Sequence, residues 1–470
     1  MSNPLKELKN ERDALFEKLT KAKSDAAAAA ARARKANKAE AEDTARRAVE
    51  LKSQVARISD QLKTAEKDLK VAQKEHEKSA TRATEKLNAT QAAQAAEQNP
   101  LMASKVDYFA LGKWLADQAK DRVCFVEGAG WGEWTGTHWQ FDERPSAELL
   151  DRVRTAYNTV ASDVVAKLNE NAMAAENILK HAQGALTLSR NLFNQPTVAH
   201  LVAFKNYTVD LRNGETMDHN PKHYMTGALQ CDYNPDADLD RILSTFARFW
   251  PEDAETAEMF QTVVGYSLTA ETEAKITPML VGNQENTNDN GDNGKSLVQN
   301  ALAVMHGTGK GGWGSAVKAS LIIDTGDRDA NSHDAAKKPL IWRRYAMATE
   351  MRKGASVDAG EFNRLSGGDI LTARMPHAPD GVEFVNFSTI FLSFNQAPRF
   401  KTWDKATKKR LCPFPFYETF YDPGSAPEGA QEQEPGLKTW LLSKYGQEAL
   451  ALYAVRGAVR YYALNGGEAG

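Results

Sequence analysis

The 470-residue sequence has little cysteine and no long hydrophobic run. Its three cysteines, Cys124, Cys231 and Cys412, have no paired spacing, which excludes a disulfide framework and a zinc cluster. The mean hydropathy is −0.54 and no run of about 18 apolar residues occurs, so the sequence predicts no membrane-spanning helix and no membrane partner. Because the first residues also lack the apolar core of a secretory signal, we expect a multidomain cytoplasmic protein.

Glycine, proline and aromatic residues are almost absent from the first hundred positions. No Gly or Pro lies between Pro4 and Pro100, Phe16 is the only aromatic residue before Pro100, and all nine Trp follow it. Residues 1–100 hold 21 basic and 16 acidic side chains, whereas the rest of the chain holds 38 and 46, so their net charges are +5 and −8. The total of −3 excludes a polycation that coats nucleic acid non-specifically.

Residues 1–100 predict an all-α coiled-coil extension. Their composition favours helix, and apolar residues recur at heptad spacing in two frames. The first frame contains Leu5, Leu8, Leu15, Leu19 and Ala22, and the second contains Ala48, Leu51, Val55, Ile58, Leu62, Ala65, Leu69 and Ala72. The frames are out of phase by one residue, so we expect a hinge or the turn of a helical hairpin between Ala26 and Ala41. The expected role is to hold subunits or a partner protein together, and contact with nucleic acid is the alternative for its basic charge.

Residues 105–240 predict a mixed α/β domain. The Gly- and Trp-rich run Gly128–Trp139 predicts short strands with tight turns, and a helical pattern extends from Ser146 to His181. The alternating segment Phe204–Leu211 meets Asn213-Gly214, a strong hairpin signal because both residues tolerate positive φ. We interpret the Trp cluster as core packing, with stacking on single-stranded bases as the alternative.

A strand, a Gly-rich loop, Lys-Ser and a helix indicate a nucleotide site. The apolar strand Ile276–Gly282 precedes the loop Asn290–Ser296, and the helical run Leu297–His306 follows. In such a loop the backbone N–H groups and the helix N-terminus face phosphates. The predicted nucleotide-binding residues are Gly291, Asn293, Gly294, Lys295, Ser296 and Leu297.

Two side chains of this loop have specific predicted roles. Lys295 would neutralise the β- and γ-phosphates of ATP, and the Ser296 hydroxyl would ligate Mg²⁺. The position six before Lys295 is Asp289, where the usual spacing has glycine. We therefore interpret the polar residues Asn283–Asp289 as a seven-residue insertion that bulges from the loop.

Two later strands end in candidate catalytic residues. Leu340–Ala348 predicts a strand followed by Glu350, whose carboxylate would polarise the attacking water and join Ser296 at the metal. A solvated strand end is the alternative for this Glu. The next strand, Ser388–Phe394, ends in Asn395, whose amide would sense the γ-phosphate.

A basic triplet precedes one more strand. Lys408, Lys409 and Arg410 come directly before Leu411–Phe416. A basic residue here would reach the nucleotide of a neighbouring subunit as an arginine finger, and Arg410 is the first candidate among the three. Ordinary surface charge is the alternative, and only the other motifs favour the finger.

The order of these motifs resembles the superfamily III helicases of phages, plasmids and large DNA viruses, specifically the C-terminal part of phage/plasmid primase–helicases. The resemblance extends over about residues 105–465. It rests on GDNGKS at Gly291–Ser296, MATEM at Met347–Met351, RLSGGDILTAR at Arg364–Arg374, FLSFNQAP at Phe391–Pro398, KKRLCPFPF at Lys408–Phe416, and the upstream segments KNYTVDLRNGE and CDYNPDA.

The resemblance implies the following domain order. An α/β, AAA+-like P-loop ATPase domain with a central parallel sheet occupies residues 241–425. The family's mixed α/β N-terminal domain precedes it at 105–240, and a C-terminal helical segment follows at 426–470. The coiled-coil extension, residues 1–100, occupies the place of the expected primase domain, which is absent.

The resemblance also implies a function. The chain would form a homo-oligomeric ring, usually a hexamer, with ATP and Mg²⁺ bound between subunits, and would translocate on single-stranded DNA to unwind the duplex at a fork. The hairpin before the sensor strand would carry Arg374 and His377 to DNA in the pore, where one basic residue per subunit attracts phosphate without a basic total charge. Relatives commonly carry Lys where this chain has Asn363, so either Arg364 replaces that contact or it is lost.

The leading hypothesis is therefore an ATP-dependent replicative DNA helicase of a phage or mobile element, acting in the host bacterial cytoplasm. The second is a nucleotide-dependent ring that acts as a loader or scaffold and recruits primase or polymerase through residues 1–100. A third, a DNA-packaging or general AAA+-like motor, is disfavoured by the Ser-Gly-Gly-Asp element at Ser366–Asp369.

Overall fold

The computed structural model describes most of the chain, and its contacts divide it into two compact units. One unit consists of residues 1–104 and 157–163, and the other of residues 105–156 and 164–470. None of the described helices is both long and apolar enough to cross a membrane. The described residues are 4–33, 41–97, 108–160, 173–283, 292–323, 335–348, 356–374, 381–395, 398–400 and 404–465.

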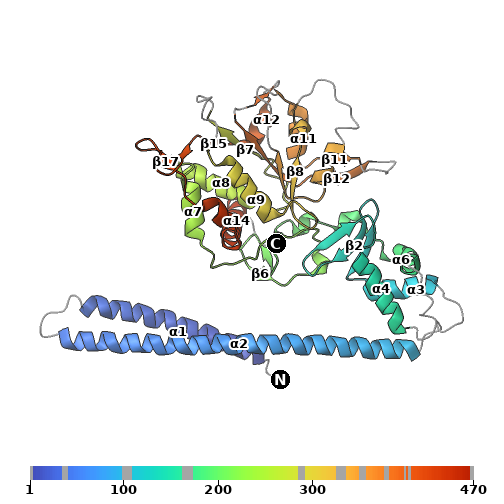
Figure 1. The fold of residues 1–470 in the computed structure, drawn as a ribbon, viewed down its shortest axis with the longest axis horizontal. Helices are drawn as coiled ribbons and strands as arrows, with labels where there is room; N and C mark the ends of the chain where they lie inside the picture. Colours follow the sequence, from blue (N-terminus) through green and yellow to red (C-terminus); the bar gives the residue numbers. More distant parts are fainter. Residues whose placement is uncertain are drawn as a thin grey trace. The chain divides into compact units, whose positions relative to one another are not determined.

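The smaller unit is a helical hairpin. Helices α1 (Pro4–Ala33) and α2 (Ala41–Glu97) lie side by side and antiparallel (Figure 1). The buried apolar residues of their packing are Leu19, Ala22, Leu62, Ala65 and Leu69. Of the two interpretations of the break between Ala26 and Ala41, the hairpin turn is the one that fits. Each heptad frame belongs to its own helix, so the two frames need not share one phase.

The larger unit begins with helices around a small antiparallel sheet. Helix α3 (Tyr108–Ala119) packs on α6 (Met173–Leu186), and α4 (Ala147–Val160) follows the sheet. Of the predicted helix from Ser146 to His181, the described residues form α4 and the first part of α6, and residues 161–172 lie outside the described part. The sheet has the order β1 (Val123–Val126), β2 (Gly130–Trp134) and β3 (Trp139–Asp142).

The Trp residues of this small sheet pack in its core. Trp139 is only 1% exposed, and its ring contacts those of Trp134, Phe193 and Tyr224. Its indole N–H donates to the Pro221 carbonyl oxygen at 2.8 Å, so its polar group is satisfied as well. The interpretation of this cluster as core packing is confirmed.

A second antiparallel sheet contains the predicted hairpin. Its strands are β4 (Leu201–Ala203), β5 (Thr208–Asp210) and β6 (Thr216–Met217). The Gly214 N–H donates to the Asp210 carbonyl oxygen at 2.7 Å, and Gly214 has φ +79°, as the Asn-Gly signal predicts. The predicted strand Phe204–Leu211 was too long, because the Phe204 N–H donates to the Tyr207 carbonyl oxygen and closes a turn there.

Five parallel strands form the central sheet of the larger unit. Their order is β15-β7-β13-β9-β8, so β13 lies between β7 and β9. The strands are β7 (Thr277–Gly282), β8 (Gly314–Val317), β9 (Tyr345–Ala348), β13 (Thr389–Phe394) and β15 (Leu411–Phe416). The chain therefore has the mixed α/β class expected from its sequence. The predicted strand Leu340–Ala348 is shorter, because residues 338–340 form a 3₁₀ turn and Trp342 has φ +56°.

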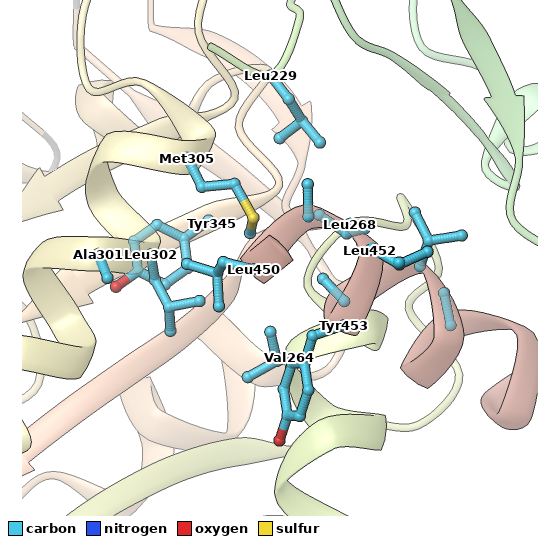
Figure 2. Packing of buried hydrophobic residues seen from close by; sticks show 14 of the residues in the cluster. Leu229, Val264, Leu268, Ala301, Leu302, Met305, Tyr345, Leu450, Leu452 and Tyr453 are labelled. Carbon is cyan, nitrogen blue, oxygen red and sulfur yellow. The ribbon is translucent and has the colours of Figure 1, made fainter. Parts of the chain in front are cut away.

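Helices cover this sheet and complete the core. Helix α9 (Lys295–His306) follows β7, and α14 (Lys444–Leu464) packs closely on α8 (Ala254–Tyr266). Figure 2 shows Leu450, Leu452 and Tyr453 of α14 in one cluster with Val264 of α8 and with Leu302 and Met305 of α9. The other elements of the described residues are α7 (Leu239–Ala247), β10 (Ser356–Val357), α11 (Ala359–Ser366), β11 (Ile370–Ala373), β12 (Val382–Val385), β14 (Arg399–Phe400), α12 (Lys405–Arg410), β16 (Phe420–Tyr421), β17 (Gln431–Glu432), α13 (Leu437–Leu441) and short 3₁₀ turns.

Candidate nucleotide-binding site

The loop between β7 and α9 ends in a tight turn at the first residue of the helix. Gly294 caps α9 with φ +79°, and a Cβ added there would lie 2.2 Å from the Phe249 ring. Only glycine therefore fits at this position. Asp292, two residues earlier, also has positive φ, at 51°. The loop thus brings its backbone N–H groups and the N-terminus of α9 to the carboxyl edge of the sheet, the arrangement that favours anions.

Lys295 is the buried cation of this loop. Its side chain is 4% exposed, and its ammonium group donates to the Asn293 Oδ1 at 2.8 Å. A Cβ added to Gly282 would lie 2.8 Å from the Lys295 Nζ and 3.1 Å from the Asn395 carbonyl oxygen. Burial lowers the pKa of Lys295 to about 8. Three predicted residues, Asn293, Lys295 and Asn395, thus meet where β7 and β13 end.

A cavity of about 600 Å³ opens over this loop, a volume typical of small-molecule sites. The predicted residues that line it are Asn293, Gly294, Lys295, Ser296, Leu297 and Asn395. Nine further described residues that no sequence motif predicts also line it, and these are Thr245, Arg248, Phe249, Asp292, Phe420, Gln433, Glu434, Leu437 and Lys438. Except for Asp292, which lies within the loop, they come from segments far from the loop in sequence and match no local motif.

Arg410 lies away from this cavity. It is the last residue of α12, and the next residue, Leu411, begins β15 opposite Thr277 at the amino end of β7. The loop follows the other end of β7, six residues along the strand, which corresponds to about 20 Å. The guanidinium Nη1 donates to the Ala406 carbonyl oxygen at 3.1 Å. Arg410 therefore lies at the opposite end of the sheet from the cavity of its own chain.

The hairpin predicted before the strand that ends at Asn395 is present. Strands β11 and β12 pair antiparallel, with Ala373 opposite Val382, and Arg374 follows β11 as an exposed residue. Arg364 donates to the Glu361 Oε1 at 2.8 Å, and the Asn363 amide donates to the Thr407 Oγ1 at 3.2 Å. The predicted site residues Gly291, Glu350 and His377, and most of the proposed insertion, lie outside the described residues.

The chain is a mixed α/β protein with a cavity at the carboxyl edge of a five-stranded parallel sheet, over the loop between β7 and α9. Residues 112–251, under a third of the chain, match the family model described as D5 N terminal like. This match supports the resemblance to phage-type primase–helicases, and it overlaps the region 105–240 in which the upstream motifs lie.

Solved structures of the NrS-1 C-terminal region are similar to this chain at low identity. The A form of its apo structure has 12% identity and a TM-score of 0.42, over 75% of this chain and 71% of that chain. Its apo structure of residues 305–718 has 10% identity and a TM-score of 0.41, over 78% and 76%. No curated protein matches the chain.

Proposed function

We propose that this protein is an ATP-dependent replicative DNA helicase of a phage or mobile element. The observation that carries the proposal is the position of Lys295, a buried ammonium group at the N-terminus of α9, beside the loop and the end of β13. Within the described ranges its ammonium group has a neutral amide oxygen as its hydrogen-bond partner, and a buried cation in such surroundings is unfavourable unless an anion joins it. The phosphates of a nucleotide would be that anion.

The strand order supports an AAA+-like P-loop ATPase. With β13 between β7 and β9, Asn395 follows a strand adjacent to the one that leads into the loop. Open α/β sheets bind ligands at the carboxyl ends of their strands, at the point where the strand order reverses. Asn395 would then sense the γ-phosphate, and Glu350, two residues beyond β9, would activate water on the other side of β13.

The loop also suits Mg²⁺ held together with a nucleotide. Ser296 is exposed and lines the cavity, so its hydroxyl would be a ligand alongside phosphate oxygens and water. Mg²⁺ keeps several waters and is usually bound by few protein groups, with Glu350 as the proposed second one. The ion would neutralise the negative charge that develops on the phosphates during hydrolysis.

The position of Arg410 supports hydrolysis between subunits of a ring. Arg410 lies at the amino edge of the sheet, so it would serve the nucleotide of a neighbouring copy, and Lys408 or Lys409 would be the alternatives in the same helix. The β11–β12 hairpin, with Arg374 beside its turn and His377 within it, would contact single-stranded DNA in the pore of a hexamer.

Strand displacement on tailed DNA forks tests the proposal. We expect that single-stranded DNA stimulates ATP hydrolysis. We also expect ATP-dependent unwinding of forks that carry a single-stranded tail of one polarity, either 3′ or 5′.

The second candidate function is a ring that loads or recruits primase or polymerase, and it is favoured by the compact separate hairpin of α1 and α2. It predicts nucleotide binding without strand displacement, and an assembled protein that hydrolyses no ATP would contradict the helicase.

Nucleotide affinity is expected to fall above pH 8. Because burial lowers the pKa of Lys295 to about 8, the ammonium is present below that pH and lost above it, so phosphate binding must take up a proton there. The affinity for ADP should fall about tenfold per pH unit above 8. Calorimetric titration in two buffers of different ionisation enthalpy measures both quantities. Lys295→Arg, whose charge persists, should give any residual binding a flat profile, and constant affinity of the unmodified protein without proton uptake would contradict the prediction.

A further inference from the structure

One wall of the cavity is formed by the C-terminal segment, residues 417–441. Its backbone is attached to the loop, because the Phe420 N–H donates to the Asp292 carbonyl oxygen at 3.0 Å. The ring of Phe420 packs edge-on against Phe249 at 5.5 Å, and Phe249 occupies the space left by the missing Cβ of Gly294. The C-terminal segment is therefore packed against the phosphate loop rather than merely near it.

Two arginines attach this segment to α7 and the residues that follow it. Arg241 forms an ion pair with Glu434 at 3.0 Å, and its guanidinium lies 4.0 Å from the centre of the Trp440 ring. Arg248 donates to the Gln431 Oε1 at 3.1 Å and lies 3.9 Å from the second Glu434 oxygen. Glu434, the one carboxylate of the C-terminal segment among the described cavity-lining residues, is thus paired with two cations.

Lys438 is the exception in this wall. It is exposed and lines the cavity, and its side chain has no hydrogen bond or ion pair to any residue within the described ranges. Lys295 is held by Asn293, and Arg248 is held by Gln431. Among the described cations that line the cavity, Lys438 is therefore the one without a partner in the described ranges, so its ammonium is available to an incoming anion in addition to that of Lys295.

We propose that Lys438 is a second cation for the phosphates of the bound nucleotide, supplied by the same chain from the C-terminal segment. This inference rests on the proposed nucleotide site. A nucleoside polyphosphate carries more negative charge than the N-terminus of α9 and one buried ammonium neutralise. Lys438 supplies further positive charge from the C-terminal segment, and the Arg241–Glu434 pair holds that segment to α7.

Nucleotide titrations of Lys438 variants of the full-length chain test this role. Lys438→Ala should weaken ADP binding about tenfold, which corresponds to about 1.4 kcal/mol. Its affinity for adenosine, measured by displacement of a fluorescent nucleotide, should stay unchanged because adenosine has no phosphate. Lys438→Arg should restore most of the ADP affinity. Because Lys438 is exposed, the gap between Lys438→Ala and the unmodified protein should shrink as salt rises.

The control and the contrary results are distinct. Lys222 is an exposed lysine that does not line the cavity, so Lys222→Ala should leave ADP binding unchanged. If Lys438→Ala binds ADP as the unmodified protein does while Lys295→Ala loses binding, the role of Lys438 is wrong and the proposed function stands. Equal weakening of ADP and adenosine also overturns it, since the contact would then be to the nucleoside. If the unmodified protein binds no nucleotide, both proposals fail.

Discussion

Replacing Lys295 with Ala is expected to lower ATP hydrolysis by a factor of at least about a hundred. The side chain is 4% exposed, and its ammonium lies at the meeting point of the loop, β7 and β13. One preorganised donor that stabilises developing charge in a water-poor site contributes about 10²- to 10³-fold in rate, and a full positive charge on the phosphates should contribute no less. Steady-state hydrolysis with and without single-stranded DNA measures the loss.

The same variant separates catalysis from folding. Burial lowers the pKa of Lys295, so the ammonium is unfavourable in the free protein at pH 7, and Lys295→Ala should unfold at the same temperature as the unmodified protein or above it. Lys318→Ala, which removes an exposed lysine, is the matched control and should retain activity. If Lys295→Ala hydrolysed ATP at more than about a tenth of the normal rate, the proposed role of Lys295 in hydrolysis would be wrong.

Replacing Gly457 with Ala is expected to destabilise the protein by about 3 kcal/mol. Ala at an exposed helix position normally adds about 1 kcal/mol of stability over Gly. Here a Cβ on Gly457 of α14 would lie 2.0 Å from the Gln261 carbonyl oxygen of α8, and one on Gly265 would lie 2.0 Å from the Ala458 nitrogen. The two backbones touch at this crossing, so a single methyl group must push the helices apart. Urea denaturation measures the change.

Gly184 supplies the control for this substitution. It lies in α6, and nothing lies within 4 Å of a Cβ added there. Gly184→Ala should therefore raise the free energy of unfolding by up to about 1 kcal/mol. If both variants were stabilised alike, the close contact between α8 and α14 would be absent, and so would the cluster in Figure 2 that it holds together.

Several elements could be predicted from the sequence because local signals specify them. The bounds of β15, Leu411–Phe416, were predicted correctly from one apolar run after a basic triplet. The turn at Asn213-Gly214 follows from the positive φ of Gly214. The helices α1 and α2 follow from two heptad frames without Gly or Pro, which left a hinge or a hairpin turn open between them. Each of these signals acts over a few residues, so it operates in any tertiary context.

Other elements were mispredicted where a neighbour in space overrides the local pattern. The apolar run from Leu340 predicts a longer strand than β9, but only Tyr345–Ala348 pairs with β8 and β13. The run from Phe204 breaks at a backbone turn before β5. Hydrophobic periodicity indicates that a segment is buried, whereas pairing with a neighbouring strand determines how many of its residues are extended.

The local sequence specifies the loop side of the cavity. A glycine with positive φ, a lysine and a serine at the start of a helix are neighbours along the chain, so their geometry is local. Only the tertiary structure brought Asn395 beside Lys295, because β13 inserts between β7 and β9. The tertiary structure alone also placed Lys438 in the lining of the same cavity, because packing between residues far apart in sequence leaves no periodic pattern in either segment.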